Sequence, residues 1–318
     1  MTTKEKDIGL IRKIVVLVGP TAIGKTELSL AVAEEFGGEI ISMDSMQIYK
    51  YMDIGTAKPT PGERRRVPHH LVDFVDPAEP YHVGRYVADA RSAIEQVAAG
   101  NRLPMLVGGT GLYMRGLLDG IFDLPAIPRE IRENVLRMLQ EKGTDFLHRE
   151  LAGIDPESAA RIHPHDSQRL SRALEIWQAT GIAWSRHLAL QQEAAAQRHE
   201  TYQVLKIGLN CDRPLLYARI NRRVEIMVEQ GIVREVEGLL ARGYCRDLNS
   251  MQSIGYRHMI NYIDGIWPWD EALTLLARDT RRYAKRQLTW FTRDREINWF
   301  RPDEAGPVRT VVQKFLNS

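Results

Sequence analysis

The chain has 318 residues, of which 44% are hydrophobic, and its 43 basic and 41 acidic side chains give a formal net charge of +2. This composition excludes a disordered chain. No apolar run approaches the roughly 20 residues of a membrane span. Two cysteines are too few for a disulfide scaffold or a Cys-rich zinc site. We therefore expect a cytoplasmic protein, outside the membrane, whose length fits about two domains or one core with an insertion.

The first part of the chain alternates between short β-branched apolar runs and segments with helical spacing. We expect strands at residues 14–18, 38–43, 103–107 and 202–209, and helices at residues 25–36 and 83–99. Strands that alternate with helices in this way predict an α/β fold, with a mostly parallel sheet flanked by helices.

Residues 123–199 have a different character. A linker with two prolines at residues 124–128 precedes helix-like segments near 129–142, 144–152 and 166–179, and a polar run rich in Ala and Gln follows at 189–198. No part of this segment has the pattern of a strand. We interpret it as an all-α insertion domain.

The insertion divides the remaining chain into two parts, residues 12–122 and 200–318, which we expect to form one discontinuous catalytic core. After the last predicted strand the sequence is mostly helical. We expect helices there at residues 213–242, 252–264, 269–291 and 307–316.

The strongest motif lies between the first predicted strand and the first predicted helix. It matches G-x-x-x-x-G-K-[ST] over the residues Gly19, Pro20, Thr21, Ala22, Ile23, Gly24, Lys25 and Thr26. Glycines let backbone N–H groups converge on phosphate oxygens, Lys25 supplies a point charge, and the Thr26 hydroxyl can ligate Mg²⁺. The motif predicts a bound polyphosphate, but it leaves open whether the protein is a kinase, an NTPase or an enzyme that expels pyrophosphate.

Two further strand ends carry side chains suited to chemistry. Asp44 follows the second strand and precedes Ser45, Met46 and Gln47. An acidic residue at this edge of the sheet faces the ligand crevice, where it can bind a metal or act as a general base, although a helix N-cap is the alternative. A glycine-rich turn brings the Thr110 hydroxyl to the same edge, and a tight turn alone would also explain those glycines.

The charges are unevenly distributed. Residues 201–300 carry 16 basic and 12 acidic groups, and residues 278–295 carry seven basic and two acidic ones. Such a patch is typical of a nucleic-acid or phosphate surface, or of a solvated helix face. Its centre consists of Arg281, Arg282, Lys285 and Arg286.

Together these motifs resemble the tRNA dimethylallyltransferase (tRNA isopentenyltransferase) family, in its bacterial form, from about residue 14 to residue 300. Beyond the phosphate loop, the matching blocks are residues 44–49, 52–59, 107–113, 162–164, 166–175, 253–257 and 283–291, in the family's order. One departure is His165, where the family usually has Asn. The two cysteines cannot form the Cys/His zinc finger of the eukaryotic members.

The resemblance implies a reaction. A dimethylallyl group passes from dimethylallyl pyrophosphate to N6 of the adenine that is 3′-adjacent to the anticodon of tRNA, and pyrophosphate leaves. Mg²⁺ is the implied cofactor. The implied catalytic residues are Asp44 as general base, Thr110 beside it, and Lys25 and Arg223 on the pyrophosphate. Sequence alone does not separate Arg223 from the neighbouring Arg219 and Arg222.

The resemblance also implies tRNA contacts, from a protein that we expect to be a monomer. The implied residues are Asp44, Ser45, Met46, Gln47, Thr110, Arg132, Gln168, Arg169, Leu170, Ser171, Arg172, Gln252, Ser253, Ile254, Gly255, Tyr256 and Arg257. Arg169 and Arg172 lie three residues apart on a predicted helix and so project from one face. The basic patch fits either the donor phosphates or tRNA phosphates, and the sequence leaves both open, as it does ATP binding to the phosphate loop.

Three alternatives compete with this interpretation. One is an isopentenyltransferase that modifies free AMP, ADP or ATP, against which the insertion and residues 168–172 argue. The second is a small-molecule P-loop kinase, with Asp44 as base on a hydroxyl and residues 123–199 as a lid. NTPases usually have a second apolar strand that ends in an Asp for the metal, and the nearest candidate here, residues 40–44, matches that signature incompletely, which disfavours this alternative. The third is a nucleotide-binding RNA adaptor, which would not need a candidate base beside the phosphate loop.

Overall fold

The computed structural model describes residues 12–120, 127–196 and 202–318. The chain divides into two compact units, one made of residues 1–118 and 200–318 and the other of residues 119–199. We call them the core unit and the helical unit and describe each by itself. None of the helices in the described ranges combines the length and apolar composition that a membrane crossing requires.

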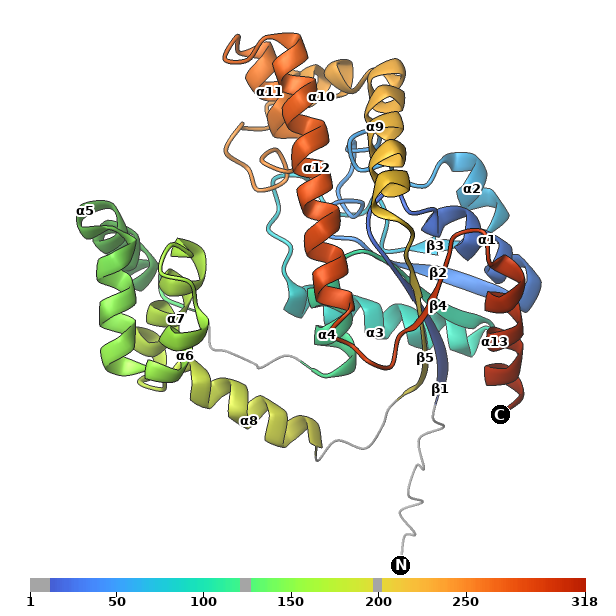
Figure 1. Cartoon of the computed structure of the whole chain (residues 1–318), viewed down its shortest axis with the longest axis horizontal. Helices are drawn as coiled ribbons and strands as arrows, with labels where there is room; N and C mark the ends of the chain where they lie inside the picture. The colour runs from blue at the N-terminus through green and yellow to red at the C-terminus, as the bar shows by residue number, and fades with distance from the viewer. Residues whose placement is uncertain (1–11, 121–126, 197–201) are drawn as a thin grey trace, which may run out of the picture. The chain divides into compact units, whose positions relative to one another are not determined.

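The core unit is built on one parallel sheet, drawn as arrows in Figure 1. In chain order its strands are β1 (Arg12–Val18), β2 (Gly38–Met43), β3 (His69–His70), β4 (Leu103–Gly108), β5 (Tyr202–Leu209) and β6 (Asn298–Phe300). Their spatial order is β3-β2-β4-β1-β5-β6, and every pairing is parallel. The central strand β1 is buried from Ile14 to Val18, as expected for a parallel sheet covered on both faces.

Helices cover the sheet and extend beyond its carboxyl edge. Those described in the core unit are α1 (Lys25–Phe36), α2 (Pro61–Arg66), α3 (Val83–Ala99), α4 (Gly111–Leu118), α9 (Arg213–Gln230), α10 (Ile232–Ala241), α11 (Tyr256–Ile263), α12 (Trp269–Phe291) and α13 (Ala305–Asn317). A second apolar cluster, away from the sheet, packs Val236 and Met259 of α10 and α11 against Ile48 and Met52. The segment after β2 is therefore attached to the C-terminal helices, among which α9 and α12 lie side by side (Figure 1).

The predicted fold class, a mostly parallel α/β core with an all-α insertion, is confirmed, but some predicted elements differ. Residues 213–242 form two helices and not one, because Gly231 adopts φ +93° and separates α9 from α10. The helix expected over residues 252–264 begins only at Tyr256, behind Gly255 with φ +99°. Strands β3 and β6 and helix α2 are too short to produce a periodic pattern.

The helical unit contains α5 (Arg129–Ile154), α6 (Pro156–Arg161), α7 (Ser167–Thr180) and α8 (Trp184–Ala196), and no strand within its described residues. Val135, Leu147 and Leu174 lie in its own apolar core. The backbone of α5 is broken at Gly143, with φ +77°, which is the point where the two predicted helical segments meet.

Two helices of the helical unit, α8 and α6, were not predicted. The polar run at 189–198 belongs to α8 up to residue 196, because its Ala and Gln residues are good helix formers. Residues 197–198 of that run and residues 124–126 of the predicted linker lie outside the described residues. The Asp155 side chain caps the short helix α6 by accepting a hydrogen bond from Ser158 N at 3.0 Å.

Candidate functional site

The phosphate loop, residues 19–26, leads from β1 into α1, as the motif predicts. Gly24 precedes α1 with φ +106°, a left-handed conformation that favours glycine. Gly19 lies against β5, where a Cβ atom would stand 2.8 Å from the carbonyl oxygen of Leu209. The helix begins without a side-chain cap, so its first N–H groups are suited to binding an anion.

The Lys25 side chain folds back over the loop. Its ammonium donates hydrogen bonds to the carbonyl oxygens of Gly19 and Pro20, each at 2.9 Å. Burial lowers the pKa of Lys25 to about 8, the Asp44 carboxylate opposes this shift, and the Arg223 guanidinium adds to it. An anion bound between Lys25 and Arg223 would favour the charged form of the lysine.

The structure separates the three arginines of α9 that the sequence could not. Arg219 donates from Nη1 to the carbonyl oxygen of Ile23 at 2.7 Å and so supports the phosphate loop. Arg222 is exposed and pairs with two glutamates of its own helix. Arg223 faces the interior, where burial lowers its pKa and its Nε is buried with no hydrogen-bond partner among the described residues.

Asp44 and Thr110 come together at the carboxyl ends of the paired strands β2 and β4. Asp44 Oδ1 accepts hydrogen bonds from the N–H groups of Met46 at 2.8 Å and Gln47 at 3.3 Å. The Thr110 hydroxyl accepts one from the N–H of Ser45 at 3.2 Å. No helix starts here, since the residues after Asp44 form a turn. The alternative of a helix N-cap is therefore wrong, and Asp44 is oriented by a turn at the end of β2.

Two residues of α12 reach the same place, and we did not assign a role to either from the sequence. The first is Tyr283, whose hydroxyl lies near Thr110 and which lines both cavities described below. Burial raises the pKa of Tyr283 and the charge of Asp44 raises it further, so the phenol stays protonated.

The second is Gln287, a buried side chain one helical turn further along. Its Oε1 accepts a hydrogen bond from the N–H of Thr21 at 2.9 Å, and its Nε2 donates to the carbonyl oxygen of Gly109 at 2.9 Å. The sequence did offer a signal for Gln287. It is a polar residue four positions after Tyr283, on the helix face that also carries the apolar Ala284 and Leu288.

Two adjoining cavities open on these residues. The first, of about 270 Å³, is lined largely by the phosphate loop, and we call it the phosphate cavity. The second, of about 300 Å³, includes Val224, Met227 and Ile254 in its wall, and we call it the apolar cavity. The residues that line both are Thr21, Asp44, Thr56, Arg223 and Tyr283. Ligands in the two cavities would meet at these shared residues.

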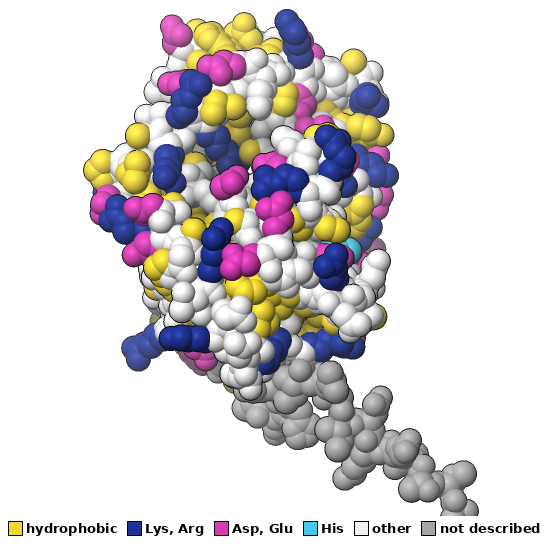
Figure 2. Space-filling view, turned by 90° about the vertical axis from the view of Figure 1, so that its right-hand side faces the viewer, with side chains coloured by type: hydrophobic (Ala, Val, Ile, Leu, Met, Phe, Trp, Pro, Cys, Tyr) yellow, Lys and Arg dark blue, Asp and Glu magenta, His cyan; other side chains and the backbone are white. Residues whose placement is uncertain are grey.

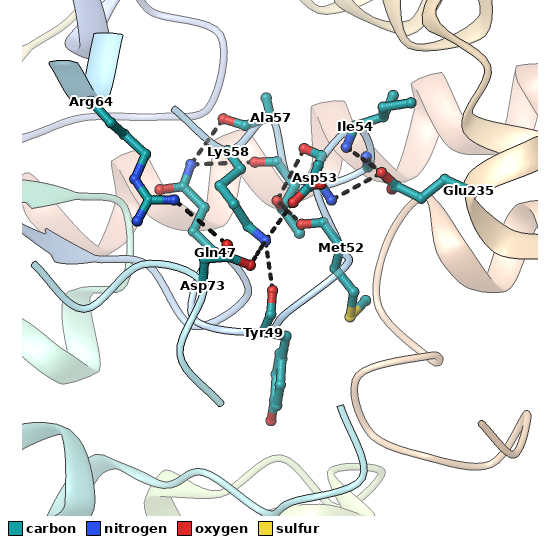
Figure 3. A network of polar contacts seen from close by, with 12 residues as sticks. Gln47, Tyr49, Met52, Asp53, Ile54, Ala57, Lys58, Arg64, Asp73 and Glu235 are labelled. Atoms are coloured by element: carbon teal, nitrogen blue, oxygen red, sulfur yellow. Dashed lines mark hydrogen bonds and ion pairs between the residues drawn. The ribbon is translucent and has the colours of Figure 1, made fainter. Parts of the chain in front are cut away.

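The loop of residues 52–58 supplies part of this boundary (Figure 3). The carbonyl oxygen of Thr56 accepts hydrogen bonds from Arg223 Nη2 at 3.4 Å and from Gln47 Nε2 at 3.3 Å. Gln47 also donates to the carbonyl oxygen of Ala57 at 3.1 Å. The loop backbone therefore holds two side chains that line the phosphate cavity.

The block 252–257 contributes unequally. Its first four residues, Gln252 to Gly255, line the apolar cavity. Tyr256 is fully buried, and its hydroxyl donates to Glu235 at 2.6 Å. Arg257 forms an ion pair with Asp279 at 2.5 Å. The first four residues are thus placed to contact a ligand, whereas Tyr256 supports the site from within.

The other implied tRNA-contacting residues lie in the helical unit. Arg132, Gln168 and Arg169 are exposed, and Arg169 is paired with Asp166. The Leu170 side chain is fully buried in the core of the unit, so it can support the helix but cannot reach a ligand. The two remaining residues of the block, Ser171 and Arg172, are half-buried, and the arginine pairs with a glutamate of α7.

The basic patch on α12 is partly neutralised. Asp279 forms ion pairs with both Arg278 and Arg282. Arg281 donates to Asn221, while Arg286 lines the apolar cavity. On the face drawn in Figure 2, basic and acidic side chains are likewise interspersed. Local ion pairs therefore offset part of the positive charge of the patch.

The residues that could hold a cation are few. Thr26 lines the phosphate cavity and is exposed at the start of α1. The described residues contain no group of three His, Cys, Asp or Glu side chains that could hold a metal ion. His70 is instead paired with Glu39 at 2.7 Å. A hydroxyl in a phosphate-binding cavity suits Mg²⁺, which is commonly bound through phosphate oxygens and water in place of an all-protein cage.

Comparisons with known proteins cover nearly the whole chain. It matches the family described as IPP transferase over residues 47–294 and the family described as Isopentenyl transferase over residues 12–70. It is 49% identical over 303 residues to the tRNA dimethylallyltransferase of Desulfotalea psychrophila, which covers 95% of each chain. It is 46% identical over 305 residues to that of Desulfosudis oleivorans, which covers 96% of each.

Solved structures are similar as well. The tRNA isopentenylpyrophosphate transferase of Bacillus halodurans is 40% identical, with a TM-score of 0.71 over 96% of this chain and 97% of that one. A eukaryotic dimethylallyltransferase acting on tRNA is 27% identical, with a TM-score of 0.78 over 96% of this chain and 80% of that one.

Proposed function

Because the chain belongs to the tRNA dimethylallyltransferase family, it is a prenyltransferase that modifies tRNA, and we propose that it moves the dimethylallyl group from dimethylallyl pyrophosphate to N6 of the adenine 3′-adjacent to the anticodon. One observation supports this donor and this target atom: Asp44 and Arg223 line both a phosphate cavity and an apolar cavity. Pyrophosphate in the first and a purine in the second would bring the allylic carbon and the amine together at this boundary.

On the donor side, the phosphate loop, Lys25 and Arg223 bind the pyrophosphate. As the bond between the allylic carbon and oxygen breaks, the electron pair and the negative charge pass to the leaving group. Groups that are already in place stabilise this charge without reorganising. Within the described part of the chain the Nε of Arg223 has no hydrogen-bond partner, which supports this role, since a bound anion would give it an acceptor.

On the acceptor side, Asp44 takes the proton that N6 loses as the new carbon–nitrogen bond forms. The adenine amine is a poor nucleophile because its lone pair is delocalised into the ring, and a positioned base typically contributes about 10²–10⁴-fold. The hydrogen bonds from Met46 and Gln47 hold the carboxylate in place. Thr110, with Tyr283 behind it, orients the amine beside the base.

Mg²⁺ is the proposed cofactor, held by the Thr26 hydroxyl and the phosphate oxygens of the donor. When bound, it would neutralise part of the charge on the pyrophosphate. The side chain of Thr26 supports this role because it lines the phosphate cavity at the N-terminus of α1.

The target adenine lies in an RNA loop and must be unstacked to enter a cavity. We place it in the apolar cavity, beside Gln252 to Gly255, with the exposed Arg132, Gln168 and Arg169 on the surrounding tRNA. We propose that the enzyme acts as a monomer. We also propose that it acts in the cytoplasm, where its tRNA substrate would be modified.

Transfer of a labelled dimethylallyl group tests the proposal. Purified protein is incubated with Mg²⁺, labelled dimethylallyl pyrophosphate, and unmodified tRNA or free AMP. We expect label only in tRNA, and only where an adenine follows the anticodon; tRNA with guanosine at that position is the matched control. Label in AMP would favour the adenylate-modifying alternative, and no transfer to either acceptor would contradict the proposed reaction.

A further inference from the structure

Glu235 of α10 holds the loop of residues 52–58 from outside the site. Its Oε2 accepts hydrogen bonds from the N–H groups of Asp53 at 3.0 Å and Ile54 at 2.7 Å. Its Oε1 accepts from the N–H of Gly55 at 3.1 Å and from the Tyr256 hydroxyl at 2.6 Å. Figure 3 shows the Glu235 side chain reaching these consecutive amides. Hydrogen bonds to a carboxylate are stronger than those between neutral groups, so one side chain fixes three residues of backbone.

Shape reinforces these hydrogen bonds. Tyr256 is fully buried, and its ring lies so close to Gly55 that a Cβ atom there would stand 2.5 Å from it. The loop cannot move towards α11, because the ring blocks it, and cannot move away without breaking the hydrogen bonds to Glu235. Its first half is therefore held from both sides.

The far end of the loop has its own anchor. The Lys58 side chain is only 4% exposed, and its ammonium pairs with Asp53 at 2.6 Å and Asp73 at 2.9 Å. It also donates to the carbonyl oxygen of Tyr49 at 2.7 Å, as Figure 3 shows. The two anchors leave Thr56 and Ala57 between them.

The segment between the anchors is the wall between the two cavities. Gly55 lines the apolar cavity, Ala57 lines the phosphate cavity, and Thr56 lines both. The Thr56 carbonyl oxygen holds Arg223 and Gln47, as described above. We propose that Glu235 is a positioning residue for the transfer reaction. It holds the backbone of residues 53–56, and this backbone places Arg223, the arginine that binds the leaving pyrophosphate.

This inference rests on the proposed function of the two cavities. Glu235 does not line either of them, so it would act only through the loop. If Glu235 served stability alone, its loss would lower the free energy of unfolding and leave the kinetic constants and the pyrophosphate dissociation constant of the folded enzyme unchanged. If it positions Arg223, binding of pyrophosphate must also change.

The test compares Glu235→Gln with Glu237→Gln, which makes the same change at an exposed position of the same helix. Binding of inorganic pyrophosphate is measured by calorimetry and the transfer reaction by steady-state kinetics, both well below the unfolding temperature. We expect Glu235→Gln to lower kcat/KM for the donor by about ten- to a hundredfold and to weaken pyrophosphate binding in parallel, since small misplacements of a catalytic group have effects of this size. Glu237→Gln should match the parent enzyme.

A double mutant identifies the route. In an Arg223→Ala background, Glu235→Gln should have much less effect on pyrophosphate binding, because its target is already gone. Full additivity, or unchanged binding and kinetics in the single variant, would overturn the proposal. Should Glu235→Gln fail to fold, Tyr256→Phe removes one hydrogen bond to the same carboxylate and should shift pyrophosphate binding in the same direction by less; no shift would likewise overturn it. Failure of the parent enzyme to label tRNA would contradict the proposed function alone, since pyrophosphate binding is measured separately.

Discussion

The side chain of Gln287 accepts a hydrogen bond from the backbone N–H of Thr21 at 2.9 Å, which joins α12 to the phosphate loop. Its Nε2 donates to the carbonyl oxygen of Gly109, next to Thr110. Gly109 leaves the necessary space, since a Cβ atom there would stand 2.1 Å from Gln287 Nε2. One amide therefore connects the phosphate loop with the turn beside Asp44.

Replacing Gln287 should affect both stability and catalysis. Gln287→Met keeps the length of the side chain but leaves the half-buried Thr21 N–H without its acceptor and the buried Gly109 carbonyl oxygen without its donor. A buried group left unsatisfied costs about 1–3 kcal/mol. We expect the free energy of unfolding in urea to fall by that amount and kcat/KM for the donor to fall as well. Gln313→Met, at an exposed position of α13, should change neither. A stability unchanged from the parent would show that the two hydrogen bonds do not hold the loop.

Asp44→Asn tests the general base. The amide oxygen can still accept from Met46 and Gln47, so the turn after β2 should keep its shape. A base that no longer takes the proton should lower kcat by about 10²–10⁴-fold while binding of inorganic pyrophosphate is largely kept. Calorimetry and single-turnover transfer to tRNA measure the two effects. Turnover at the parent rate would remove Asp44 from this role.

The pH dependence of pyrophosphate binding should report Lys25. Its pKa is lowered to about 8 in the free enzyme, so the ammonium is charged below that pH and loses its proton as the pH rises through it. Affinity for inorganic pyrophosphate should therefore fall above about pH 8. In Lys25→Arg the guanidinium does not titrate in this range, and ionisation of the ligand itself affects both proteins equally. The ratio of the two dissociation constants should change near pH 8; a constant ratio would contradict the assignment.

Tyr86 offers a stability test outside the site. It is fully buried on α3, stacked on Tyr113 with ring centroids 4.1 Å apart, and its hydroxyl has no hydrogen-bond partner among the described residues. Tyr86→Phe keeps the stacked ring and removes a desolvated hydroxyl, so we expect it to raise the free energy of unfolding by up to about 1 kcal/mol. Tyr81→Phe is the matched control, because its hydroxyl donates to Asp89 at 2.8 Å and its loss should lower stability. Equal effects of the two variants in urea titrations would contradict this reasoning.

Arg169→Ala should mainly weaken tRNA binding. Arg169 is exposed on the helical unit, and each phosphate contact that is lost reduces the salt slope of binding by about one. Filter binding of unmodified tRNA at several salt concentrations measures both quantities. The control is Arg161→Ala on α6 of the same unit, an exposed arginine paired with Glu157. If both variants bind alike, Arg169 does not lie on the tRNA surface.

The fold could be predicted because its central strands and longest helices have strong local patterns. The apolar run of β1, the glycine-rich turn into α1 and the helical spacing of α12 each agree with the structure. The short strand β3 forms only because β2 offers it an edge to pair with, and no local pattern reveals that edge. The break at Gly231 was missed because a glycine within a helical pattern does not by itself show that φ is positive.

The candidate site was predictable where a motif places backbone and side chain together. Asp44 follows β2 directly, Lys25 follows β1 through the phosphate loop, and the carboxyl ends of parallel strands meet at one edge. Gln287 and Glu235 act through hydrogen bonds to backbone groups far away in sequence, at Thr21 and residues 53–55. Any backbone amide has the same chemistry whatever its side chain, so sequence carries no trace of these partners.

The spacing of three side chains on α12 has a consequence for how the enzyme can change. Asp279, Tyr283 and Gln287 stand four residues apart and contact Arg257, Thr110 and the phosphate loop in turn. Since each residue advances an α-helix by about 100°, insertion or deletion of one residue before this segment would rotate all three away together. The walls of the phosphate cavity and of the apolar cavity are therefore aligned by one helix. Substitutions that adapt the enzyme to a bulkier substrate are best sought on the loops around α12, where one cavity can be reshaped while the other keeps its alignment.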